Sequence, residues 1–66
     1  MRGKISWFHK QRNYGFITGE DGVDVFFHTS EYQGSILEIK DGLAVEFERK
    51  TNRDGSLRAV QVKQIT

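Results

Sequence analysis

The chain has 66 residues, no cysteine, two histidines and a formal net charge of +1, and this length allows one domain, over residues 1–66, with a small core. The lack of cysteine excludes disulfides and thiolate metal sites, and two histidines alone are too few for a metal site. Because the sequence has neither the apolar run of a signal peptide nor the roughly 20 apolar residues of a membrane span, we expect a cytoplasmic protein with no membrane partner.

Short strands are predicted along the whole chain. Runs rich in β-branched and aromatic residues, in which apolar and polar residues alternate, are typical of strands with one solvent-facing side. Three Asp-Gly pairs separate these runs, and glycine supplies the positive φ that tight turns need. The predicted strands cover residues 3–9, 14–19, 23–29, 43–50 and 57–64.

The connections between these strands indicate a closed barrel. Residues 19–22 form a hairpin turn, and residues 30–42 make the one long connection. A helical candidate at residues 35–40 is too short to change the fold class. Closure removes the exposed edges that a flat sheet offers for aggregation. The sequence therefore predicts an all-β fold, a five-stranded antiparallel barrel.

The alternation of side chains separates core residues from exposed ones on the second and third strands. Successive side chains of a strand point to opposite faces, and we expect Ile17, Val25 and Phe27 to face the core. The residues that then point outward are Tyr14, Phe16, Phe26 and His28. Trp7 and Phe8 are adjacent, so either one of them points outward or a bulge lets both approach the outer face.

An outward cluster of rings favours a surface on which nucleobases stack. The inverted barrel, with these rings as core, would expose Ile5, Ile17 and Val25 together while burying His28. Every base has a π-face, and stacking on an aromatic side chain is worth about 1–3 kcal/mol per base of single-stranded nucleic acid. The basic residues beside the rings in sequence, which would contact phosphates, are Lys4, Lys10 and Arg12.

Charge is distributed unevenly along the chain. Residues 1–20 carry four basic groups and one acid, residues 21–48 carry seven acids and one lysine, and residues 49–66 carry five basic groups and one acid. If the two ends fold side by side, the protein has one positive face in spite of its near-neutral total. The alternative is that the opposite signs pair across neighbouring strands.

Two stretches of the sequence resemble the cold-shock domain family. Residues 3–17 read GKISWFHKQRNYGFI and residues 24–30 read DVFFHTS, similar to the family pattern G-K-V-K-W-F-N-x-x-K-G-[FY]-G-F-I followed by D-V-F-V-H-[FT]-S. The resemblance covers essentially the whole chain. It implies a barrel of the oligonucleotide/oligosaccharide-binding (OB) type that binds single-stranded RNA and DNA as an RNA chaperone or transcription antiterminator. It also implies no cofactor, no catalysis and no small-molecule substrate.

The same resemblance assigns roles to individual residues. Base stacking falls to Trp7, Tyr14, Phe16, Phe26 and His28. Further contacts fall to Lys4, Phe8, Arg12 and Asp24, with Arg53 and Arg58 near the positions of a family arginine and glutamine. For Asp24 two roles remain open, because this acid either accepts a hydrogen bond from a base edge or caps the neighbouring turn.

Several positions depart from the family pattern. Ser6, His9 and Asn13 stand where the family usually has Lys, Asn and Gly, and Thr29 stands where Phe is common although Thr also occurs. Asn is the best substitute for glycine where the backbone is left-handed. The long connection contains no Phe, and Tyr32 or Ile36 would compensate in part. Fewer rings predict weaker binding than that of a typical member.

A peptide-binding module on a small barrel is the alternative function. The acidic middle segment supports it, whereas Lys4, Lys10 and Arg12 favour a ligand with phosphates. An enzyme is not expected, because Asp24 and His28 lie four residues apart on one strand, a separation of about 13 Å. No catalytic residue and no metal ligand is therefore predicted. We expect a monomer, with strand exchange through the altered last hairpin as the alternative.

Overall fold

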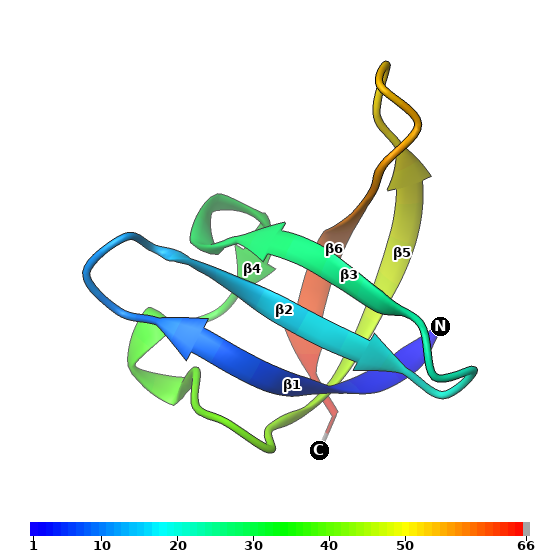
Figure 1. Cartoon of the computed structure of the whole chain (residues 1–66). Helices are drawn as coiled ribbons and strands as arrows, with labels where there is room; N and C mark the ends of the chain where they lie inside the picture. Colours follow the sequence, from blue (N-terminus) through cyan, green and yellow to red (C-terminus); the bar gives the residue numbers. More distant parts are fainter. Residues whose placement is uncertain (66) are drawn as a thin grey trace.

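Five long strands curl into a closed barrel (Figure 1). The computed structural model describes residues 1–65; Thr66, the last residue of the expected domain, lies outside the described residues. The long strands are β1 (Arg2–His9), β2 (Tyr14–Gly19), β3 (Asp24–His28), β5 (Ala44–Thr51) and β6 (Leu57–Gln64). Every predicted strand is present, with its ends within one residue of those expected. The predicted all-β barrel is confirmed.

The barrel closes through a parallel contact. The sheet order is β3-β2-β1-β5-β6, with antiparallel pairs between successive strands, and Phe26 on β3 pairs in parallel with Arg58 on β6. A two-residue strand, β4 (Tyr32–Gln33), also runs parallel to β6. The expectation of a purely antiparallel barrel therefore misses these two short pairings. Strand periodicity predicts neither, because β4 is too short to show an alternation and the pattern along one strand does not specify which other strand it pairs with.

The long connection between β3 and β5 contains β4 and two single turns of 3-10 helix. These turns are η1 (Thr29–Glu31) and η2 (Ile36–Glu38), and η2 lies inside the helical candidate at residues 35–40. Each turn has three residues, so the fold class is unchanged, as expected. Over residues 1–65, the structure holds no helix that is both long and apolar enough to cross a membrane.

A β-bulge at Ser6 decides which of the two adjacent rings on β1 faces outward. The register of β1 against β2 shifts between Ile5 and Trp7, which leaves Ser6 as the additional residue. Ile5 faces the core, so strict alternation would turn Trp7 inward as well; the bulge turns Trp7 outward instead. Phe8 is half-buried and stacks on the core ring of Phe27, with a centroid distance of 6.0 Å. One ring of the pair faces outward, and the other belongs to the core side.

The core draws on every long strand. Its members are Ile5, Ile17, Val25, Phe27, Tyr32, Ile39, Leu43, Val45, Phe47, Ala59 and Val62. All the residues that we expected to face inward are buried, and Ile17 and Phe27 have no exposed surface. The inverted barrel is therefore wrong.

Tyr32 is a core residue and not a loop ring. Its side chain is 7% exposed, and its hydroxyl donates a hydrogen bond of 2.9 Å to Oε1 of Glu38. The expectation that Tyr32 compensates for the missing loop phenylalanine is wrong, because its ring packs into the barrel from β4. Burial, with the neighbouring Glu38 carboxylate, raises the pKa of Tyr32 to about 12.

This raised pKa predicts a loss of stability in alkaline solution. Below the ordinary tyrosine pKa of about 10 the hydroxyl is neutral in the folded and the unfolded chain, so its stabilising effect is complete. This stabilising effect is lost as the pH rises through the pKa of the folded state. We expect the free energy of unfolding to fall by about 2 kcal/mol more in the wild type than in Tyr32→Phe between about pH 9 and about pH 11.5. Urea unfolding of both proteins measures this difference. Parallel pH profiles would contradict it.

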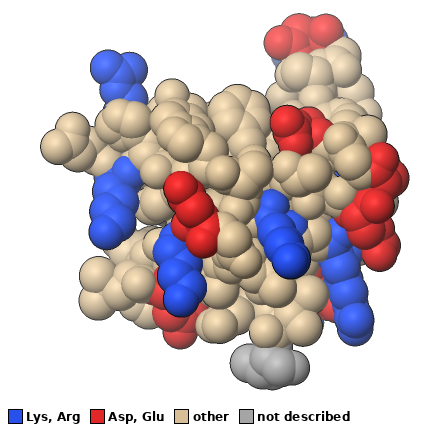
Figure 2. Space-filling view, turned by 60° about the horizontal axis from the view of Figure 1, so that its bottom comes forward, with Lys and Arg blue, Asp and Glu red and all other residues tan. Residues whose placement is uncertain are grey.

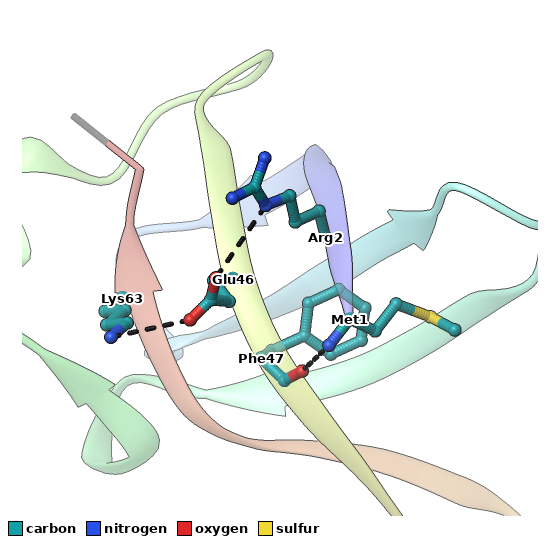
Figure 3. A network of polar contacts seen from close by, with 5 residues as sticks. All are labelled: Met1, Arg2, Glu46, Phe47 and Lys63. Atoms are coloured by element: carbon teal, nitrogen blue, oxygen red, sulfur yellow. Dashed lines mark hydrogen bonds and ion pairs between the residues drawn. The ribbon is translucent and has the colours of Figure 1, made fainter.

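Some of the opposite charges pair across neighbouring strands, as the alternative reading of the charge pattern predicts. The Glu46 carboxylate on β5 lies 3.7 Å from Nε of Arg2 on β1 and 3.4 Å from Nζ of Lys63 on β6 (Figure 3). The N-terminal ammonium donates a hydrogen bond of 2.8 Å to the Phe47 carbonyl. The two ion pairs of Glu46 are exposed, so each contributes at most about 1 kcal/mol to the free energy of unfolding.

Candidate nucleic-acid interface

Three exposed rings form a row across β1, β2 and β3. Trp7 pairs with Phe16, which in turn pairs with Phe26. The three residues are 42%, 37% and 38% exposed, respectively. Neighbouring ring centroids in the row are 6.1 Å apart. These rings are large apolar groups that the core does not use, on a domain that has little core material.

A second row of rings runs beside the first. His9 pairs with Tyr14, and Tyr14 pairs with His28. The Tyr14 ring lies 5.5 Å from that of Trp7 and 5.6 Å from that of Phe26, so it joins the two rows. We call Trp7, Tyr14, Phe16, Phe26 and His28 the aromatic face. The structure thus brings together all five residues predicted to stack on bases.

Gly15 lets the strands that carry these rings approach each other. It lies between Tyr14 and Phe16 on β2, is buried, and pairs with Phe8. A Cβ at this position would collide with the carbonyl oxygen of Trp7 and come within 3.0 Å of the Phe27 ring. The inward side of β2 therefore has no room for a side chain at this position, which explains the glycine. The bulge of this strand pair lies at Ser6 on β1 and not at Gly15.

His28 is held by the turn that follows it. Its Nδ1 accepts a hydrogen bond of 3.1 Å from the Ser30 amide and lies 3.0 Å from the Ser30 hydroxyl. His28 is thus the N-cap of η1, which is a structural role. The side chain is exposed. Capping fixes the imidazole while leaving its surface available to a ligand.

A polar row extends the aromatic face along the same strands. Lys4 pairs with Thr18, and Thr18 pairs with Asp24. The Thr18 hydroxyl donates a hydrogen bond of 2.6 Å to Oδ1 of Asp24. The turn is capped instead by Asp21, whose Oδ1 accepts a bond of 3.2 Å from the Val23 amide. The turn-capping role proposed for Asp24 is therefore wrong, and the exposed carboxylate stands at the end of a row that continues the face.

The structure separates the predicted basic contacts into two groups. Lys4 lies on β1, Arg12 lies in the turn between β1 and β2, and Arg58 is the β6 partner of Phe26. Arg53 lies in the hairpin end between β5 and β6, which projects from the barrel (Figure 1). Three of these four residues thus flank the aromatic face, whereas Arg53 stands apart.

The positive charge is dispersed. Figure 2 shows Lys and Arg side chains spread over one face, with acidic side chains among them and more of these at its right edge. In the described part of the chain, no three His, Asp or Glu side chains lie close enough together to hold a metal ion.

A smaller apolar patch lies beside Phe8. Phe8 and Ile36 line one shallow hollow together with Lys10 and Asn13. Ile36 is 54% exposed, and Leu37, which lines the same hollow, is 92% exposed, so these two residues of the long connection offer an apolar surface here. Asn13 has a φ of 61°. This left-handed backbone is what its place in the family pattern predicts.

Sequence reasoning missed His9 as a member of the second row. The signal was its position two residues after Trp7, which places both side chains on one face. That signal could be used only once the outward direction of Trp7 was known, and the bulge at Ser6 decides that direction.

Comparison with known proteins gives one consistent result. The family model of the 'Cold-shock' DNA-binding domain matches residues 1–65. A cold shock-like protein of Thermotoga maritima is 43% identical and is matched over 98% of each chain. Cold shock protein CspB of Geobacillus stearothermophilus is 40% identical over 96% of this chain and 97% of its own. Among solved structures, Drosophila Unr CSD456 superposes with a TM-score of 0.75 at 24% identity, over 98% of this chain and 26% of that one.

Proposed function

Because this chain belongs to the cold-shock domain family, a family of nucleic-acid-binding proteins, we propose that it binds single-stranded RNA and DNA through the aromatic face. The observation that carries the proposal is the row of Trp7, Phe16 and Phe26, each more than a third exposed. Stacking on such rings tolerates every base, because each base has a π-face.

Basic residues around the face supply contacts to phosphates. Lys4 lies on the polar row and Arg58 beside Phe26, whereas Lys10 and Arg12 lie in the turn that follows His9. Phosphates of a strand whose bases lie on the rings would run along this margin. Each basic side chain that contacts a phosphate releases bound counterions, which makes the affinity dependent on salt.

This mode of binding suits an RNA chaperone or a transcription antiterminator. A base that stacks on Phe16 or Phe26 is held away from a pairing partner, so the protein competes with weak secondary structure in the nucleic acid. Polar Thr29 and the Phe-less long connection leave fewer rings than the family pattern has. We therefore expect moderate affinity, which favours rapid release of the strand.

A titration with a short oligothymidine tests the proposal. We expect saturable quenching of Trp7 fluorescence, with an affinity that falls as salt rises by a logarithmic slope of about −0.7 per phosphate contacted. Lys4→Gln should reduce the slope by about one contact, whereas Lys63→Gln, which removes a charge from the β5 and β6 side, should leave it unchanged. Unaltered fluorescence at low salt, in a protein that circular dichroism shows to be folded, would contradict the proposal.

A further inference from the structure

His9 presents a ring to the same surface as the aromatic face. Its ring centroid lies 5.8 Å from that of Trp7, with the planes inclined by 70°. The rings of His9 and Tyr14 are parallel to within 1°, with centroids 6.1 Å apart. The side chain is half-buried. Its contacts are with the two rings that join the rows, which makes it a continuation of their surface on β1.

The turn after β1 fixes this imidazole. Nδ1 of His9 accepts a hydrogen bond of 3.3 Å from the Arg12 amide, and the His9 carbonyl accepts one of 3.0 Å from the Asn13 amide. A neutral imidazole that accepts at Nδ1 carries its proton on Nε2. The ring is thus held in place and retains a donor for the ligand.

The neighbourhood of His9 suits a nucleotide. Lys10 and Arg12 follow it in the turn, and both are exposed. On the other side the second row continues through Tyr14 to His28. Without His9 this row would have no ring on β1, although the first row has Trp7 there. The row with His9 is as wide as the first and ends beside two cations.

We infer that His9 is an additional base-stacking residue, which extends the binding site by one nucleotide toward the turn of residues 10–13. The inference rests on the proposed function. A base on this ring would place its phosphate next to Lys10 and Arg12. The ring contributes mainly its face, and the Nε2 proton is available to an acceptor on the same nucleotide.

Two substitutions at this position separate the ring from other effects. His9→Asn removes the ring and keeps a side-chain acceptor for the Arg12 amide, whereas His9→Phe keeps a ring. We expect His9→Asn to weaken the binding of a fluorescein-labelled oligothymidine about 5- to 10-fold, and His9→Phe to stay within about 2-fold of wild type. Fluorescence anisotropy is the readout, because a change beside Trp7 would alter tryptophan emission by itself.

Two reference variants make the outcomes distinct. Gln64→Ala, at an exposed position of β6, should bind like the wild type, and Phe26→Ala should lose affinity. If Phe26→Ala weakens binding while His9→Asn stays within about 2-fold of wild type, the inference is overturned and the proposed function stands. If neither variant weakens binding, the proposed function fails and the inference fails with it. Equal losses in His9→Asn and His9→Phe, with unchanged melting temperatures, would also overturn the stacking role.

Discussion

Phe26→Ala should weaken oligothymidine binding about 10- to 100-fold while changing the free energy of unfolding by no more than about 1 kcal/mol. The ring lies between those of Tyr14 and Phe16, at 5.6 Å and 6.1 Å, and is 38% exposed. Its backbone neighbour on the other side is Arg58. A base stacked at this position would therefore contact a ring in the middle of the face and a cation at its edge.

The matched control for this change is Val23→Ala. Val23 directly precedes β3 and is 41% exposed, so its truncation removes apolar surface of similar exposure away from the two rows of rings. Isothermal titration calorimetry measures both affinities, and thermal melting measures both stabilities. If Phe26→Ala binds as tightly as Val23→Ala, the aromatic face is not the binding surface.

The hairpin of β2 and β3 was predictable from the sequence because its alternation is unbroken. Once Ile17 and Val25 are assigned to the core, each remaining side chain of the two strands has only one face available. The positions of Tyr14, Phe16, Phe26 and His28 follow from that rule. Local pattern and tertiary packing agree in this part of the chain, so the prediction needed no knowledge of the barrel.

Where the sequence left a side-chain direction open or predicted it wrongly, the direction depends on strand pairings that a local sequence pattern does not show. The direction of Trp7 is set by the bulge at Ser6, which exists only in the register between β1 and β2. Tyr32 faces the core because two residues of β4 pair with β6, far along the chain. Asp24 bonds to Thr18 across a strand pair, whereas its position after a glycine-containing turn suggested a cap. In each case a long-range contact overrides the local reading.

The arginines of the last hairpin show a limit of motif matching. The resemblance placed Arg53 and Arg58 near the positions of a family arginine and glutamine, and so assigned a ligand contact to both. In the structure Arg58 lies within β6 at the closing contact with β3, whereas Arg53 lies at the projecting end of the hairpin. A strand advances by roughly 3.3 Å per residue. A residue a few positions farther along the hairpin can therefore lie outside the binding surface. We expect Arg58, more than Arg53, to contribute to binding.

Phe27→Ala should cost about 3–5 kcal/mol of folding free energy, a large fraction of what a domain of this size has. Phe27 follows Phe26 directly, yet it has no exposed surface, stacks on Phe8 and lies against the position where Gly15 lacks a side chain. Its removal leaves a cavity that the closely packed β1 and β2 backbones cannot fill.

Urea unfolding followed by circular dichroism measures this cost, with Phe27→Leu as a control that retains most of the volume and should lose less stability. Binding alone would not distinguish Phe27→Ala from Phe26→Ala, because an unfolded chain also loses its ligand. The stability measurement separates them: one residue should act through the core and the next through the surface. A Phe27→Ala protein as stable as Phe26→Ala would mean that β3 does not divide its side chains between core and ligand in this way.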